Sequence, residues 1–218
     1  MKVCFVSRGR VEDFSASSLL DSEIIVFGFG SIGELNYKKE LRGESEELVK
    51  IGRLSKECNA TVICGTETEN YGIKRLSAVV ADRGKIIGIA DMNSKNTSCG
   101  YSSGGGYKII NTPTCKIGVL VAEDLYCVEA VKSMSLCETD LIIAIYPNFS
   151  DSKPTIVARA YSLLFGVPIC VCSKNFSMAT TISGEVLFSS PQEQISYEIP
   201  TKKVYREITL KQRGVILE

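Results

Sequence analysis

Short apolar blocks alternate with polar stretches along the chain, and this pattern predicts a protein built mainly from buried β-strands. Several blocks are rich in Val and Ile and are only five to seven residues long, which favours strands over helices. Turn residues such as the Asp-Arg-Gly triplet at 82–84 indicate hairpins between some of them. Strands are expected over residues 3–7, 23–27, 61–67, 107–111, 115–121 and 168–172, and hairpins over 76–90 and 181–189.

Helical spacing of apolar residues is clearest over residues 45–58. There Leu48, Ile51, Leu54 and Cys58 form one narrow apolar stripe, and glutamates gather at the N-terminal end, where the helix dipole favours them. Further helices are expected over residues 15–20, 126–135 and 156–165. Strands that alternate with helices predict a layered α/β fold, and no repeat or linker divides the chain, so we expect one domain over residues 1–218.

Acidic and basic residues are balanced, with 25 of each, so the chain carries no formal net charge. A protein of this kind has no general attraction for nucleic acid or for anionic membrane surfaces. No apolar run approaches the roughly 20 residues that cross a bilayer, and the first one is too short for a signal peptide. We therefore expect a cytoplasmic protein that binds neither nucleic acid nor membranes.

The nine cysteines lie mostly within apolar segments, where a reduced thiol behaves as a small hydrophobic group. Their odd number and the absence of paired CxxC spacing argue against a disulfide scaffold. The chain contains no histidine, which excludes histidine-based catalytic triads and argues against an ordinary zinc site. We expect neither a metal nor a cofactor.

The apolar run over residues 116–122 stops abruptly at Glu123 and Asp124. Such a pattern is typical of a buried strand that delivers side chains to a site. The two carboxylates are either a proton-handling pair or structural residues that brace the turn, and we interpret them as structural.

Several segments resemble, in order, those of the carbon-nitrogen hydrolase (nitrilase and amidase) superfamily. Residues 61–67 are similar to its Val-Val-Gly-Ser/Thr-x-Glu segment, residues 84–88 to its Gly-x-Ile-x-Gly hairpin, and residues 139–149 to its Ala-Asp-Leu-Ile-Leu-x-Pro-x-Asn-Phe run. The resemblance covers residues 2–200. It implies a four-layer αββα sandwich, in which two facing β-sheets are flanked by helices, and pairing of two such sandwiches into a homodimer.

The same resemblance places the three catalytic positions of the superfamily. Its glutamate base follows a strand that resembles residues 23–27 and aligns with Phe29; its lysine aligns with Met92; its nucleophilic cysteine aligns with Ala122. All three residues are apolar, so no thioester can form at this centre. We therefore predict a catalytically inactive relative with a binding, regulatory or assembly role. Its partner would be a second copy or another protein, and the apolar floor either accepts a small uncharged ligand or fills with its own side chains.

An active hydrolase of a small amide remains the alternative, with displaced residues in place of the lost ones. Glu34, Lys95 and Cys127 lie five, three and five residues beyond the aligned positions. The first two are equally well explained as solvated loop charges, and Cys127 as a residue at a helix start, where its thiol pKa would be lowered.

The remaining candidates are structural or lie at the rim of the site. They are Glu123, Asp124, Glu129, Asn148 and Arg159. We expect Glu129 and Arg159 to join the two carboxylates after the strand in a buried ion-paired cluster.

Overall fold

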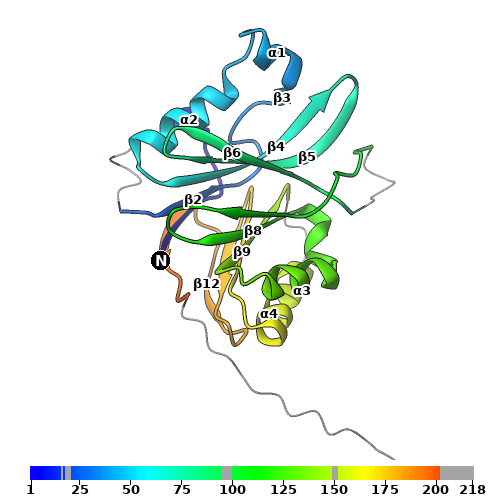
Figure 1. Cartoon of the computed structure of the whole chain (residues 1–218). Coiled ribbons are helices and arrows are strands. Elements are labelled where there is room, and N and C mark those ends of the chain that lie inside the picture. The colour runs from blue at the N-terminus through cyan, green and yellow to red at the C-terminus, as the bar shows by residue number, and fades with distance from the viewer. Residues whose placement is uncertain (16, 18–20, 95–99, 149–151, 202–218) are drawn as a thin grey trace, which may run out of the picture.

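Two β-sheets lie face to face, and helices cover the outer face of each (Figure 1). The structure is a computed structural model that describes residues 1–15, 17, 21–94, 100–148 and 152–201. The four layers, helix, sheet, sheet and helix, confirm the predicted αββα sandwich.

The first sheet has the strand order β13-β1-β2-β4-β5-β6, with the short β3 paired to β4. Strands β1, β2 and β4 are parallel, whereas β5, β6 and β13 run antiparallel to their neighbours. The predicted hairpin at residues 76–90 is confirmed, and both Arg83 and Gly84 have the positive φ that a two-residue type I′ turn demands. The strands are β1 (Lys2–Val6), β2 (Ile24–Phe27), β3 (Leu35–Asn36), β4 (Thr61–Asn70), β5 (Ile73–Asp82), β6 (Lys85–Asp91) and β13 (Gln194–Glu198).

The second sheet has the order β12-β11-β10-β9-β8-β7. Its three central strands β8, β9 and β10 are parallel. The expected hairpin over residues 181–189 exists, but its first strand lies earlier in the chain, because residues 181–185 form the turn. The strands are β7 (Lys108–Asn111), β8 (Lys116–Val121), β9 (Leu141–Tyr146), β10 (Ile169–Ser173), β11 (Ser177–Thr180) and β12 (Val186–Ser190).

Helices α1 (Tyr37–Leu41) and α2 (Glu47–Glu57) lie on the outer side of the first sheet, and α3 (Val128–Leu136) and α4 (Lys153–Phe165) cover the second. The 3₁₀ turns are η1 (Val11–Asp13) and η3 (Ala122–Tyr126). The helix expected at residues 15–20 lies largely outside the described residues. Among the helices that the structure describes, none is long and apolar enough to cross a membrane.

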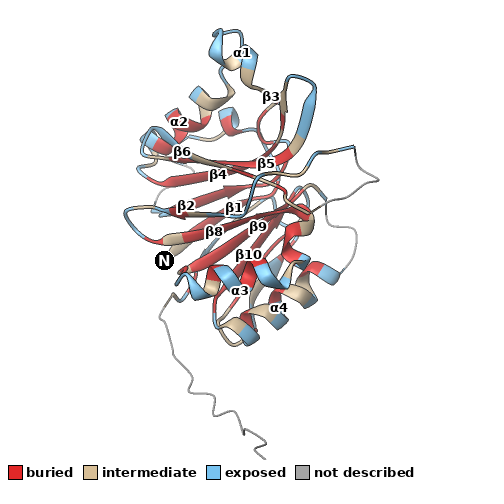
Figure 2. Ribbon diagram, turned by 45° about the vertical axis from the view of Figure 1, so that its right-hand side comes forward, coloured by how far each residue is buried: buried red, intermediate tan, exposed pale blue. Residues whose placement is uncertain are grey.

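The central strands are buried on both faces because each sheet packs against the other sheet on one side and against helices on the other, whereas the outer strands are partly exposed (Figure 2). Strand β1 illustrates the two-residue period: Val3 and Phe5 join the core between the sheets, while Cys4 and Val6 join the core under α2. A third apolar cluster lies between the second sheet and helices α3 and α4.

The parallel arrangement decides where a site can form. Strands β2, β8, β9 and β10 end at Phe27, Val121, Tyr146 and Ser173. Because parallel strands place their carboxyl ends at the same edge of a sheet, the residues that follow them gather at one end of the sandwich. Residues after β2, β9 and β10 line one cavity there, as described below.

The two sheets approach each other closely at Gly28, directly after β2. A methyl group on Gly28 would lie 2.8 Å from the carbonyl oxygen of Ser173 and 2.9 Å from its carbon, both backbone atoms that cannot turn aside.

We therefore expect Gly28→Ala to lower the free energy of unfolding by about 1–3 kcal/mol, the usual cost of overpacking. Urea unfolding followed by circular dichroism measures this change. Gly105→Ala is the matched control, because nothing lies within 4 Å of the added methyl group. Equal stability of both variants would contradict the close approach of the sheets.

Candidate functional site

The three residues predicted to occupy the superfamily's catalytic positions belong to the apolar core between the sheets. Phe29, Met92 and Ala122 are 9%, 1% and 4% exposed and lie in one cluster with residues from both sheets. Burying a phenylalanine side chain contributes roughly 1.5–3 kcal/mol to stability. These side chains thus help to hold the sheets together, and none of them carries a group that reacts.

Ala122 has an unusual backbone. It is the first residue after β8, begins η3, and has φ +49°, in the left-handed region that non-glycine residues rarely adopt. This conformation costs an L-residue about 1–2 kcal/mol. Strained residues at strand ends often present a side chain to a site. Here the sharp turn presents only a methyl group.

The Phe29 ring occupies the space beside Gly65 on β4. A methyl group on Gly65 would lie 2.7 Å from the ring carbon Cδ2 of Phe29 and 2.7 Å from Cγ2 of Ile145. The absence of a side chain at Gly65 therefore lets the aromatic ring enter the gap between the sheets.

A cavity of about 550 Å³ opens on the outer side of Phe29. Met92 and Ala122 do not line it. Its floor and walls are mainly apolar, and charged side chains lie around them. The lining residues are Phe29, Gly30, Ile32, Glu34, Thr66, Glu67, Leu76, Tyr101, Pro147 and Lys174.

Charges of both signs surround this cavity. The Glu34 carboxylate forms an ion pair with Lys74 Nζ at 2.9 Å, and both side chains are about half exposed. Lys174 is exposed and makes no ion pair with any other described residue. Exposed pairs of this kind contribute little to stability. This pair therefore places charges at the rim of the cavity but does little to stabilise the fold.

Asp124 organises the turn that follows β8. The side chain is 1% exposed. Its oxygens accept hydrogen bonds from Asn93 N at 2.9 and 3.0 Å, from Ser94 N at 2.7 Å and from Ser94 Oγ at 2.8 Å. Asp124 thereby fastens the chain just after Met92 to the end of the second sheet. This supports the structural interpretation of Asp124.

The prediction that Glu129 and Arg159 join Glu123 and Asp124 in a buried ion-paired cluster is wrong. Arg159 is exposed on α4 and its Nε donates to the carbonyl oxygen of Gly184 at 3.1 Å. Glu129 is exposed too, and its carboxylate accepts a hydrogen bond from Cys127 Sγ at 3.5 Å. Asp124 instead accepts hydrogen bonds from the backbone amides of Asn93 and Ser94 and from the Ser94 hydroxyl. Backbone donors cannot be identified from residue types because every residue but proline carries one.

Two further candidates lie at the surface or near it. Glu123 is partly buried in η3. Burial raises the pKa of the Tyr146 phenol, and the nearby Tyr126 and Glu123 raise it further. Asn148 is exposed, and its Oδ1 accepts a hydrogen bond from Asn175 Nδ2 at 3.2 Å. Its neighbour Pro147 lines the cavity, whereas Asn148 does not.

The structure does not assemble the displaced constellation from the residues that it describes. Cys127 begins α3, as expected, and packs against the helical cluster on the outer face of the second sheet. Glu34 lines the cavity and forms an ion pair with Lys74, whereas Cys127 hydrogen-bonds to Glu129. Glu34 and Cys127 therefore share no partner in these interactions. Lys95 lies outside the described residues.

Sequence reasoning missed the charged groups Glu67 and Lys174 and the aromatic wall of Tyr101. Lys174 directly follows β10. The rule that sites form at the carboxyl ends of parallel strands could have indicated it. Tyr101 carries no such signal, because it lies in the polar loop that joins two sheet edges.

The cavity offers little for catalysis. Thr66 supplies a hydroxyl, but that group already donates to the carbonyl oxygens of Gly33 and Glu67. Burial raises the pKa of the thiols of Cys64, Cys170 and Cys172, which keeps them protonated. Within the described part of the chain, no three Asp, Glu or Cys side chains are grouped to hold a metal ion. The arrangement suits binding better than bond cleavage.

Replacement of Asp124 tests its bracing role. We expect Asp124→Ala to lower the free energy of unfolding by about 2–4 kcal/mol, because buried amides at residues 93 and 94 lose a charged acceptor. Asp124→Asn, which keeps the shape and one acceptor, should cost less. Glu129→Ala, at an exposed position, should change stability by less than about 0.5 kcal/mol. Chemical denaturation of the three variants would reveal the order, and a neutral Asp124→Ala would refute the role.

Comparison with known proteins identifies the architecture. No protein-family model matches the sequence, and a search of curated proteins found no match. Solved structures do match. Nit3 from Saccharomyces cerevisiae, a member of branch 10 of the nitrilase superfamily, is 14% identical with a TM-score of 0.76, over 91% of this chain and 89% of Nit3.

Two other structures agree with it. A carbon-nitrogen hydrolase from Helicobacter pylori G27 is 16% identical with a TM-score of 0.75, over 92% of this chain and 89% of the other. A mutant of the Nesterenkonia sp. AN1 amidase, with the acetamide moiety of fluoroacetamide added covalently at its active-site cysteine, is 13% identical with a TM-score of 0.73, over 92% and 90%. At these identities the comparison concerns the backbone: the chain has the fold of the nitrilase superfamily.

Proposed function

We propose that this chain is a catalytically inactive member of the nitrilase superfamily, with a binding, regulatory or assembly role. The observation that carries the proposal is the burial of Phe29, Met92 and Ala122 together in the core, at the positions that align with the base, the lysine and the nucleophile. In this role residues 1–218 would act as one domain, in the cytoplasm and without a metal or cofactor.

The three replacements make sense as one physical event. Superfamily chemistry needs a thiolate to attack an amide or nitrile carbon, a glutamate to move protons and a lysine to hold the oxyanion. A buried charge that loses its partner costs roughly 3–5 kcal/mol. Once one of the three catalytic positions is apolar, apolar residues at the other two are more stable than unpaired charges. The packing of the Phe29 ring beside Gly65 fits such an apolar centre.

The centre is filled by its own side chains, and the cavity outside Phe29 is what remains for a ligand. Its apolar floor with Thr66 and Tyr101 at the walls suits a small uncharged molecule, while the mixed charges around it repel neither sign overall. A ligand there would contact Phe29 without reaching Ala122.

Incubation with small amides and nitriles tests the inactive state. We expect ammonia release from acetamide, propionamide or benzonitrile to equal that of the buffer blank, because no cysteine lines the described cavity. A coupled glutamate dehydrogenase assay measures the ammonia. Cys127→Ala and Glu34→Gln are the companion variants: turnover by the original chain that either change abolishes would establish the displaced hydrolase and overturn our proposal.

An assembly role has its own support on the helical layer of the second sheet. Helices α3 and α4 expose large apolar side chains: Leu136 is 74% exposed, Ile156 61%, Leu163 52% and Leu164 66%. Apolar residues exposed together on one layer are typical of an interface between subunits. We propose that two copies pair through this layer into a homodimer.

Ile156→Glu combined with Leu164→Glu should convert the dimer to a monomer, because two buried carboxylates per subunit would lack partners. Sedimentation equilibrium measures the mass directly. Leu41→Glu is the control, since Leu41 is 89% exposed on α1, away from this layer. A monomeric original chain, or a dimer that survives the double change, would argue against this interface.

A further inference from the structure

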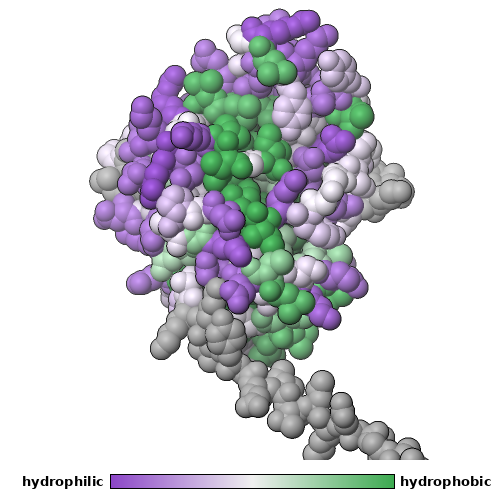
Figure 3. All heavy atoms as spheres, in the orientation of Figure 1, coloured by the Kyte–Doolittle hydropathy of each residue, from purple (hydrophilic) through white to green (hydrophobic). Residues whose placement is uncertain are grey.

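Strand β6 forms an open edge of the first sheet and lies within an exposed apolar band. It is the last strand in the order of that sheet. The face in Figure 3 shows a band of hydrophobic residues running down its middle, between hydrophilic residues on both sides. On β6, Ile86 is 37% and Ile87 39% exposed, and on α2 Val49 is 51% exposed. Edge strands with exposed apolar residues readily pair with another strand.

The backbone of β6 has free hydrogen-bonding groups on its outer side. Met92 N donates to the carbonyl oxygen of Leu76, which fixes the direction of the ladder toward β5 at that residue. Because successive residues of a strand point their amides in opposite directions, Ile89 directs its N–H and C=O away from β5. No described backbone group pairs with Ile89 on that side.

The chain itself occupies this edge further along. Ser102 N donates to the carbonyl oxygen of Lys74, at the start of β5, and Gly104 N donates to the carbonyl oxygen of Met92. The loop that carries Ser102 and Gly104 therefore covers the edge beyond Asp91. The open stretch is Lys85 to Ala90, and it contains a bulge, because the pairing with β5 shifts register between Ile86 and Gly88.

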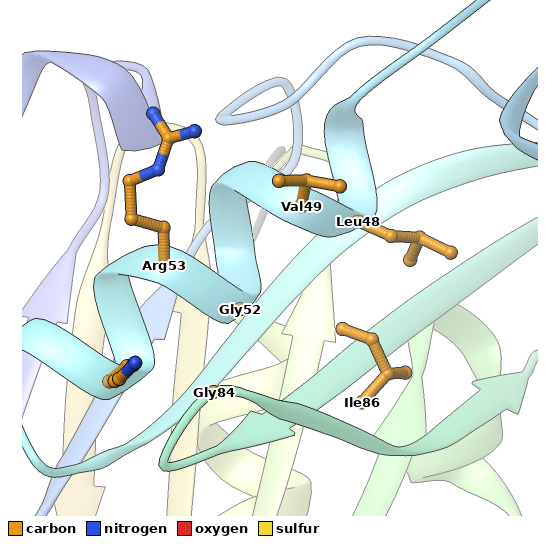
Figure 4. A pocket seen from close by; sticks show the side chains of 7 residues that line it. Leu48, Val49, Gly52, Arg53, Gly84 and Ile86 are labelled. Carbon is orange, nitrogen blue, oxygen red and sulfur yellow. The ribbon is translucent and has the colours of Figure 1, made fainter. Parts of the chain in front are cut away.

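A groove of about 420 Å³ runs beside this open stretch, between α2 and the start of β6. Figure 4 shows Leu48 and Ile86 facing each other across it, while Arg53 extends away from the strand. Gly52 lets the helix approach the hairpin, because a methyl group there would lie 3.3 Å from the carbonyl oxygen of Gly84. The groove thus offers an apolar slot next to a row of free backbone groups.

Three exposed cations surround the slot. Arg53 and Lys56 line it from α2, and Lys85 begins the open edge. All three are exposed, and none forms an ion pair or side-chain hydrogen bond with another described residue. The nearest acidic residues, Glu57 four positions after Arg53 on α2 and Asp82 opposite Lys85 in the hairpin, form no ion pair with these cations among the described residues.

We propose that this edge binds an extended acidic segment of another protein, which adds as a strand to β6. Its main chain would pair with the outward backbone groups of β6. Its side chains on the α2 side would include apolar ones, which enter the groove beside Leu48 and Ile86, and acidic ones, which meet Arg53 and Lys56. This is recognition by β-strand addition, where the backbone supplies affinity and the side chains supply specificity.

Charge disfavours a second copy of this chain as the occupant. In an antiparallel pairing of β6 with itself, centred on Gly88, Lys85 of one copy would face Asp91 of the other. Asp91 already accepts a hydrogen bond from Ser77 Oγ at 2.7 Å and lies 3.9 Å from Arg75 Nε. Self-pairing would therefore offer an acidic partner to Lys85 alone and leave Arg53 and Lys56 of the groove without one.

Selection of displayed ten-residue peptides against the full chain tests the proposal. The strongest binders should carry both apolar residues and Asp or Glu at one set of alternate positions, the set that faces α2. Synthetic copies should bind the double variant Arg53→Glu, Lys56→Glu at least about tenfold more weakly, as loss of paired charges predicts. The matched control is Lys38→Glu with Lys39→Glu on α1, two exposed cations far from the groove, which should change affinity less than about twofold.

Backbone methylation of the peptide supplies a readout that charge alone would not move. N-methylation at one set of alternate residues should abolish binding, and at the other set it should leave binding within about twofold, because only every second amide of an added strand faces β6. Binders without acidic residues, equal loss at both sets, or no effect of the groove variant would overturn the proposal. Self-association that survives the changes on α4 but is lost in Ile87→Lys would overturn it too, in favour of a second copy.

Discussion

The burial of two sheet faces against each other is the constraint on which the rest of this structure depends. Side chains from both sheets fill the space between them, and water is excluded from it. A charge placed there needs a partner, because an isolated buried ion costs several kcal/mol. Phe29, Met92 and Ala122 meet this constraint by belonging to the core. The same end of the sandwich that could hold a reactive centre is thereby used for packing.

The fold nevertheless keeps features that a simple packing core does not require. Ala122 remains in a left-handed conformation at the end of β8, and Asp124 continues to fasten the chain after Met92 through its backbone amides. These features belong to the scaffold of the turn, whose hydrogen bonds depend little on the side chain at residue 122.

Because side chains fill the core between the sheets, the surfaces that could bind a partner lie on the outside of the molecule. The cavity beyond Phe29, the apolar residues of α3 and α4, and the open edge of β6 are three separate surfaces with different chemistry. The edge differs from the others because it offers free backbone groups together with unpaired cations. An edge strand is a general liability for aggregation, so exposed isoleucines on β6 are best explained by a partner that covers them.

The sequence by itself determined the layered fold, because apolar periods of two and of three to four residues are local properties that survive without any alignment. It also indicated that residues 29, 92 and 122 carry no reactive group, since residue type suffices for that. Only the tertiary structure decided which side chains meet. The expected ion pairs of Glu129 and Arg159 do not form, and Asp124 binds backbone amides, because partners are chosen by distance across strand ends that sequence spacing does not encode. The open edge of β6 likewise depends on the order of strands, which is a property of the whole sheet.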